Sequence, residues 1–122
     1  MQFHNKRKRI VMDFDWAETL HCAVTVCDTQ GVVIYMNQCS RATFSNHGDS
    51  MVGKSMMPCH NEHSQAIIHK MLNEDVTNCY TIDKQGVRKL IYQTPWKKDD
   101  GTVGGLVEIS IVLPDELTNY VR

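Results

Sequence analysis

Residues 28–37 read Asp28-Thr-Gln-Gly31-Val32-Val-Ile-Tyr-Met-Asn37, and this stretch decides the fold class of the chain. It has the pattern of a strand end, a tight turn and a second strand, with Gly31 where a turn requires a positive φ. A similar pattern begins at Thr94, turns at Asp99-Asp100-Gly101 and continues into a long apolar segment. We therefore expect both ends of the chain to contribute strands to one sheet.

The segment between these hairpins contains the helices. Apolar residues on one broad face predict a main helix from Glu62 to Asn73. A short helix is expected over residues 37–44, and the capping box Asp15-Trp-Ala-Glu18 predicts a short N-terminal helix. Strands are expected at about 23–28, 32–37, 77–83, 87–97 and 102–113. The expected fold is α+β, a five-stranded antiparallel sheet with a helical connector on one face and an N-terminal helix.

The last predicted strand is apolar on both of its faces. Ile109 and Ile111 lie on one side, and Leu106 and Val112 on the other. An antiparallel sheet usually leaves one face in water. We therefore expect one face to be covered by the connector and the other by the N-terminal helix or by a second subunit.

Composition excludes several classes of protein. The chain has 122 residues, enough for one domain with its own core, and a formal net charge of −1. This charge does not favour nucleic acid as a direct partner, and the basic run Lys6-Arg-Lys-Arg9 is interpreted as a solvated tail. Five cysteines without a Cys-x-x-Cys pair predict reduced thiols, and no stretch resembles a signal peptide or a membrane span. The expected location is the cytoplasm, with no membrane partner.

Several short motifs, in this order and spacing, resemble a PAS domain over roughly residues 15–113. They are Asp28-x-x-Gly31-x-x-x-Tyr35-x-Asn37, Val52-Gly53-Lys54-Ser55, Thr94-Pro95, Asp100-Gly101 and Gly104-x-x-x-Glu108-Ile109-Ser110. The resemblance implies a sheet that cradles a small pocket under helices. It also implies sensing of small molecules, redox state or light, a signal passed on through helical flanks, and frequent dimers. The segment from Met56 to Ser64 resembles a bacterial subgroup of the family.

The resemblance divides the chain into a basic N-terminal flank that could be helical (1–14), a sensor domain (15–113) and a C-terminal flank (114–122). Apolar residues at helical spacing in and beside the first flank are candidates for a homodimer interface, namely Ile10, Phe14 and Ala17. The implied partners are a second copy, a small molecule, and a signalling partner or output domain, for instance in transcription regulation.

Two cofactors known in the family are weighed here. The photosensory branch carries a flavin-bonding cysteine shortly after the connector glycine, but this chain has Met56 three residues after Gly53, so flavin is not expected. Haem-binding members carry a histidine on the main helix. His63 and His69 lie on that helix, yet Ser64 or Gln65 falls at the ligand position. Haem is therefore an alternative, and the cofactor is unknown.

Residues 59–63 read Cys59-His60-Asn-Glu-His63, which offers a second alternative, a zinc or iron site. Cys59, His60 and His63 would be the ligands. Asn61 is expected to cap the main helix, so that His60 precedes regular helix. The commoner outcome for such a histidine pair is an ordinary surface or core position, and no metal is expected.

The candidate pocket residues come from the helix and the strands that would enclose a cavity. Ile67 and Met71, one turn apart, would form its roof, and the tyrosines would supply hydroxyl groups. Asn37 is included, although an Asn after a strand more often caps the next helix. The full set is Asn37, His60, His63, Ile67, Met71, Tyr80 and Tyr92.

Residues 48–55 match the phosphate-loop pattern from Gly48 to Lys54-Ser55. That site needs a buried strand before the loop and a long helix after it, and Pro58 interrupts any such helix, so the match is interpreted as accidental. No nucleophile has a convincing base beside it. The expected function is a sensor or interaction module without catalysis, which relays a conformational change through its flanks. The alternatives are a haem or metal sensor using His60, His63 or His69, and a pure interaction module with a filled core.

Overall fold

The computed structural model describes residues 14–44 and 50–122, with the exception of the Cys59 side chain. Its elements in chain order are β1 (Ala23–Asp28), β2 (Val33–Met36), α2 (Gln38–Phe44), the 3-10 turn η2 (Met57–Cys59), α3 (Glu62–Glu74), β3 (Asn78–Lys84), β4 (Val87–Lys97) and β5 (Val103–Val112). The predicted strands and the two connector helices are confirmed and differ only at their ends.

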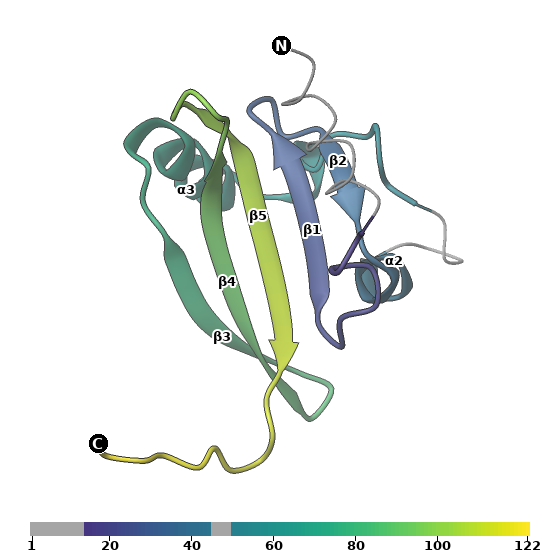
Figure 1. Cartoon of the computed structure of the whole chain (residues 1–122), viewed down its shortest axis with the longest axis vertical. Coiled ribbons are helices and arrows are strands. Elements are labelled where there is room, and N and C mark those ends of the chain that lie inside the picture. Colours follow the sequence, from purple (N-terminus) through teal and green to yellow (C-terminus); the bar gives the residue numbers. More distant parts are fainter. Residues whose placement is uncertain (1–13, 45–49) are drawn as a thin grey trace.

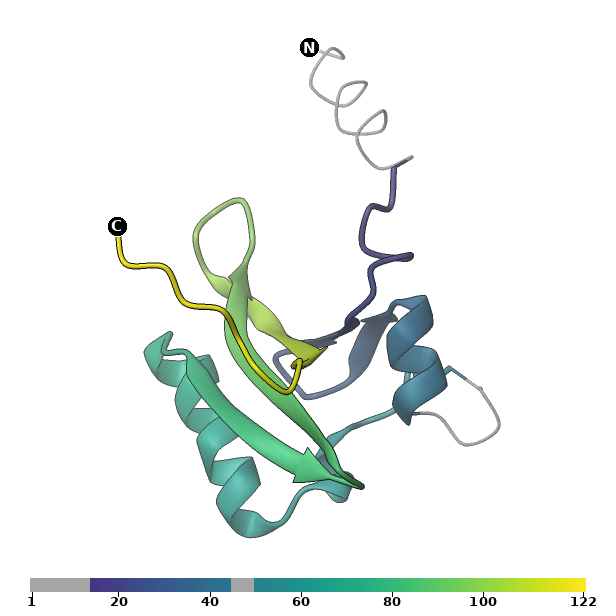
Figure 2. The same ribbon diagram turned by 90° about the horizontal axis from the view of Figure 1, so that it is seen from below.

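The sheet is antiparallel throughout and has the strand order β2-β1-β5-β4-β3 (Figure 1). The first and last strands of the chain are therefore neighbours at its centre. Figure 2 shows α2 and α3 on the same side of the sheet, with residues 14–22 before β1 and residues 113–122 after β5 on the other. We call the side under the helices the inner face and the opposite side the outer face.

A small core joins α3 to the inner face. Cys27 of β1, Leu106 of β5, and Ile68 and Met71 of α3 form one buried cluster. Four partly buried side chains pack around it, namely Met56, Met57, Ile67 and Leu72. The position of α3 is thus coupled by direct contact to the two central strands.

The glycine pair in β5 allows a close approach between strands. Trp96 of β4 donates its indole N–H to the carbonyl oxygen of Cys27 at 3.0 Å, and its ring lies directly over Gly104. Gly105 has a φ of +153°, and its Cα faces the Cys27 carbonyl closely enough to leave no room for a Cβ. The bulge predicted from these glycines agrees with a register shift in β4 after Trp96.

The predicted N-terminal helix is wrong for the part of it that the structure describes. Asp15 does act as a cap, since its Oδ1 accepts hydrogen bonds from the backbone N–H groups of Ala17 and Glu18. However, residues 16–19 form a single turn, closed by a bond from Leu20 N–H to the Ala17 carbonyl. The helix ends there because the chain enters β1 three residues later. The flank 1–13, including Ile10, lies outside the described residues.

Tyr35 ties this turn to β2, and its titration can be tested. Its hydroxyl donates to the Asp15 carboxylate, 3.0 Å from Oδ1 and 2.9 Å from Oδ2. Burial and then this carboxylate raise the pKa of Tyr35 to about 12. The unfolded chain releases the proton near pH 10. Between about pH 10 and 12 the folded state therefore binds more protons, and the free energy of unfolding falls as pH rises.

We expect Tyr35→Phe to remove this contribution. The variant should lose less stability than the parent protein between about pH 10 and 12, because it has no proton to release. Urea denaturation at several pH values would measure the difference. Tyr120→Phe in the exposed C-terminal segment is the matched control. Parallel pH profiles for the parent chain and Tyr35→Phe would contradict the assignment.

No helix in the described ranges combines the length and the apolar character needed to cross a lipid bilayer.

Candidate functional site

A groove lies between α3 and the inner face of the sheet. Its main hollow, of about 370 Å³, is lined by His60, Ser64, Ile67, Ile68, Asn78, Tyr80 and Gln93. A neighbouring hollow of about 250 Å³ is lined by Thr25, Val33, Met36, Phe44, Met51, Met56, His60 and Glu108. A third, of about 30 Å³, shares Thr25, Met56, Ile68, Gln93 and Glu108 with the other two. We call these three connected hollows the α3 groove.

The roof of the groove is the start of α3 and the segment before it. Asn61 caps the helix, because its side chain accepts from the Ser64 N–H at 2.8 Å, as predicted. His60 precedes the helix, and its Nδ1 lies 2.9 Å from the Met56 carbonyl oxygen. Gln65 donates to the carbonyl oxygens of Met57 and His60, at 2.9 Å each. These bonds fix the segment 56–60 against the first turns of α3.

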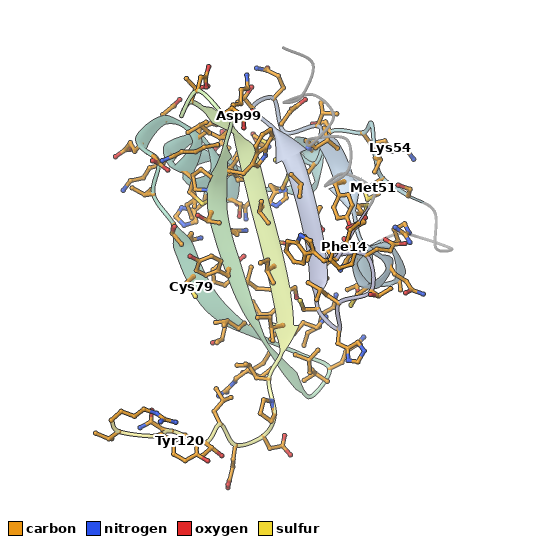
Figure 3. The ribbon with its side chains drawn as sticks, in the orientation of Figure 1. Phe14, Met51, Lys54, Cys79, Asp99 and Tyr120 are labelled. Carbon is orange, nitrogen blue, oxygen red and sulfur yellow. The ribbon has the colours of Figure 1, made fainter. Side chains whose placement is uncertain are left out.

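The connector reaches this roof along β2. Gly53 N–H donates to Val33 O at 2.7 Å, Val33 N–H donates to Lys54 O at 2.9 Å, and Met56 N–H donates to Gly31 O at 2.9 Å. Gly31 has a φ of +80°, and a Cβ there would meet Met57 at 2.8 Å. Figure 3 shows Met51 and Lys54 on this part of the connector, outside β2. Within residues 50–55, the Gly53 amide is thus bound to β2 and the Lys54 amide to the Met51 carbonyl oxygen, so neither is free to hold a nucleotide phosphate, consistent with an accidental match.

The floor of the groove is a row of polar side chains across four strands. Register pairs Thr25 of β1 with Glu108 of β5, Glu108 with Gln93 of β4, and Gln93 with Asn78 of β3. Asn78 Nδ2 donates to Gln93 Oε1 at 3.1 Å, and Gln93 Nε2 donates to Glu108 Oε1 at 2.7 Å. Thr25 is hydrogen-bonded to Ser40 of α2. We call Thr25, Glu108, Gln93 and Asn78 the polar row.

The Glu108 carboxylate affects other groups at the groove. Burial, with a further contribution from Glu108, raises the pKa of the Tyr80 hydroxyl. Burial also raises the pKa of the Cys27 thiol, and the charges of Asp28 and Glu108 add to this effect. Both groups are therefore neutral at physiological pH and offer a hydroxyl and a thiol to the cavity.

The structure brings three of the seven predicted pocket residues together. His60, Ile67 and Tyr80 line the main hollow of the α3 groove. Met71 lies 1 % exposed in the core cluster, one turn too deep to face the cavity. His63 lies on the exposed side of α3, because it precedes Ser64 by one residue and therefore points about 100° away around the helix.

Tyr92, which is predicted above to line the pocket, lies on the opposite face of the sheet. It pairs with Cys79 and with Ile109, whereas the groove residues Ile91 and Gln93 flank it on β4. Successive side chains of a strand point to opposite faces, so Tyr92 lies on the outer face and does not reach the groove. Figure 3 views this outer face and labels its partner Cys79 on β3.

Asn37 has a structural position. It is fully buried, and its Oδ1 accepts from the N–H groups of Val24 and Ser40 at 2.9 Å each. Its Nδ2 donates to the carbonyl oxygens of Ala17 at 2.9 Å and Cys22 at 2.8 Å. All of its polar capacity is therefore used to join the N-terminal turn, β1 and α2. Its predicted capping of the helix after the hairpin is confirmed, and it does not line the groove.

The metal alternative finds no cluster in the part of the chain that is described. Within residues 14–44 and 50–122, no three His, Cys, Asp or Glu side chains lie together as ligands for one ion. His63 and His69 both face solvent. The Cys59 side chain is outside the described part, so the Cys59, His60 and His63 site stays an untested alternative.

Sequence reasoning missed the polar row. Glu108 was assigned no role, and Thr25, Gln93 and Asn78 were not singled out. Thr25 and Glu108 each lie between two apolar neighbours on their own strands, which is the available signal, but only the register across four strands places the row side by side.

The outer face carries exposed apolar side chains. Tyr92 and Ile111 are more than one-third exposed, and Leu90 and Ile109 are partly exposed beside them. Phe14, a predicted interface residue, is 75 % exposed. Ala17, another, is buried within its own chain, and its carbonyl is bound to Asn37. Ala17 therefore offers little surface to a second subunit.

A wider hollow of about 660 Å³ opens at the far end of the β3–β4 hairpin, beside Pro114. Its charged groups are Asp83, Arg88 and Asp115, and the first two pair with each other at 2.8 Å. Two of the three charged groups there are thus already paired, whereas the α3 groove has a helical roof over a polar floor and is the better candidate.

The profile of the family described as PAS fold matches residues 17–116, most of the chain. The chain belongs to the PAS fold family. The α3 groove is thus a cavity between the sheet and the connector of a PAS domain, and PAS domains are sensory signal-transduction modules that are generally non-catalytic. No curated protein matches the chain in sequence.

Solved structures with the same fold are distant in sequence. A sensory box sensor histidine kinase from Vibrio cholerae has a TM-score of 0.62 at 14 % identity, over 93 % of this chain and 99 % of that one. VqmA bound to DPO has a TM-score of 0.65 at 15 % identity, over 89 % of this chain and 58 % of that one. The Aer2 receptor from Vibrio cholerae, described as a dual PAS-heme oxygen sensor, has a TM-score of 0.59 at 14 % identity, over 76 % of this chain and 95 % of that one. These likenesses concern the fold.

Proposed function

We propose that this PAS domain is the sensory module of a bacterial signalling protein and that it binds a small molecule in the α3 groove. The observation that carries the proposal is a cavity of about 370 Å³ with Asn78 and Gln93 of the polar row in its floor and Ile67 and Ile68 in its roof. The other two members of the row line the adjoining hollows. Pockets for small ligands are typically apolar with a few convergent polar groups. Two structural neighbours, VqmA bound to DPO and a dual PAS-heme oxygen sensor, are in keeping with this function.

The signal would pass from α3 to the central strands. Ile68 lines the groove and also packs with Cys27 of β1 and Leu106 of β5. A ligand that favours one packing of α3 over another would change these contacts, since it acts through different affinities for the two states. β1 follows the turn held by Asn37, and β5 leads into residues 114–122. The relay would therefore act on both flanks, 1–14 and 114–122, without catalysis by this chain.

The outer face would hold a second copy of the chain. Its exposed apolar residues, with Phe14 beside the start of the domain, suit an interface between identical subunits. The output would then be a separate domain or partner protein, with transcription regulation as one such output. The reduced thiols predicted from the sequence are in keeping with the cytoplasm.

Native mass spectrometry of gently purified protein would test whether the groove is occupied. We expect a bound small molecule, carried through purification from the native host, and its loss on denaturation. Protein that carries no bound molecule and binds no small probe in the groove would instead favour an interaction module with a filled core.

Ile67→Trp tests the location of the site. A tryptophan at this position would fill the main hollow, so we expect the bound mass to disappear. Ala66→Trp makes a comparable change on the exposed side of the same helix and should keep the bound mass. The amide NMR spectrum of each variant would verify its fold. Full retention of the ligand by a folded Ile67→Trp protein would remove the α3 groove as the site.

A further inference from the structure

The two hydrogen bonds that link β3, β4 and β5 in the polar row run in one direction. Asn78 donates to Gln93, and Gln93 donates to Glu108. Each amide therefore gives an N–H toward Glu108, and the Gln93 oxygen accepts on the side of β3. Gln93 is buried, so its orientation is fixed by these two bonds. The chain of donation therefore ends at the Glu108 carboxylate.

The Glu108 carboxylate has acceptor capacity left. An ionised carboxylate can accept about four hydrogen bonds. Among the residues that the structure describes, only the Gln93 side chain donates to it. The side chain lies at the junction of the second and third hollows of the α3 groove. A donor that enters the groove would therefore meet a partly satisfied acceptor.

The charges at the groove point to one class of ligand. Among the residues that the structure describes, no lysine or arginine lines any of its three hollows, and the imidazole there, His60, has its Nδ1 against the Met56 carbonyl oxygen. The ion pairs of Arg41, Arg88 and Lys97 in the described chain are made with Glu18, Asp83 and Asp75, away from the polar row. A partly buried anion without a cationic partner favours donors and positive charge and opposes a second anion.

We propose that the α3 groove selects a compact ligand that presents N–H donors, positively charged or neutral, to the Glu108 carboxylate. Its aromatic or aliphatic body would lie under Ile67, Ile68 and Met56, and carboxylates and phosphates would be excluded. This inference rests on the proposed function, and it adds the chemical class of the ligand.

Three probes with the same ring test this selectivity: benzamidine, benzamide and benzoate. Each would be titrated into the intact chain and followed by amide NMR shifts around Ile67, Tyr80 and Gln93. Hydrogen bonds to a charged group are stronger than those between neutral groups, and a second anion is repelled, so we expect benzamidine to bind at least about tenfold more tightly than benzoate. Benzamide, a neutral donor, should fall between them.

Glu108→Gln tests the role of the carboxylate. The variant keeps an acceptor oxygen but loses the charge, so the affinity for benzamidine should fall about tenfold while that for benzamide changes by less than about threefold. Glu116→Gln in the exposed C-terminal segment is the matched control and should change neither affinity. An unchanged amide spectrum in the absence of probe would show that Glu108→Gln is folded.

The outcomes separate this proposal from the proposed function. Benzoate binding as tightly as benzamidine, or unchanged benzamidine affinity in Glu108→Gln, would overturn the ligand class alone, provided that Ile67→Trp still blocks the groove. Failure of all three probes to bind in the groove would overturn the ligand class, and together with the absence of a bound molecule in the native mass spectrum it would overturn the ligand-binding function as well.

Discussion

Replacing Asn37 by alanine should lower the free energy of unfolding by about 4 kcal/mol, because buried backbone groups lose their partners. The side chain satisfies two N–H groups, of Val24 and Ser40, and two carbonyl oxygens, of Ala17 and Cys22. Alanine would leave a cavity and could not form a hydrogen bond with any of these four backbone groups. Water is poorly placed to replace the amide, since the position is fully buried.

Urea denaturation of Asn37→Ala measures this loss. Asn73→Ala is the control, since Asn73 is exposed on α3 and alanine favours helix, so its stability should stay within about 0.5 kcal/mol of the parent. A loss below about 1 kcal/mol for Asn37→Ala would show that the network contributes little.

Gly105→Ala should cost about 3 kcal/mol or more, through contact and backbone strain together. A Cβ at this position would lie 1.8 Å from the Cys27 carbonyl oxygen and 2.8 Å from the Asp28 Cα. Both are backbone atoms of β1, so the two central strands would have to separate. The φ of +153° is in addition one that side chains rarely adopt.

The glycines of the chain offer a control for this change. Gly101 also has a positive φ, +87°, but a Cβ there would meet nothing within 4 Å. Gly101→Ala should therefore cost only the strain of the backbone, about 1 kcal/mol. Thermal unfolding of the two variants compares them directly. Equal losses of stability in the two variants would contradict the close approach of β1 to β5 at Gly105.

Local signals explain why most of the fold could be predicted. Gly31 and Gly101 mark turns through their backbone requirements, and the α3 pattern is one broad apolar face between the cap Asn61 and the next strand. The capping box at Asp15 was equally local but misleading. Asp15 caps only a single turn, whereas the Glu18 carboxylate binds Arg41 of α2 instead of closing the box, and the chain enters β1 soon afterwards.

The candidate site depends on contacts that the sequence does not encode locally. On β4, Leu90 and Tyr92 lie on one face of the strand and Ile91 and Gln93 on the other, and each face includes apolar residues. The sequence pattern of this strand alone cannot decide which of its faces lies under α3. The face is decided by α3, which packs on Leu106 of β5. Leu106 lies on the same side of β5 as Glu108, the partner of Gln93, and these contacts join different parts of the chain. For the same reason the polar row was visible only in the structure.

The pairing of β1 with β5 has a consequence for how the chain acquires its structure. Ala23 faces Ser110, so the middle of the sheet joins positions near opposite ends of the sequence. Contacts of such long sequence separation are slow to form, because a large loop must close first. During synthesis on the ribosome, β1 and β2 must wait for β5 to emerge before their open edge is paired. Nascent chains that stop short of β5 would therefore expose that edge to aggregation.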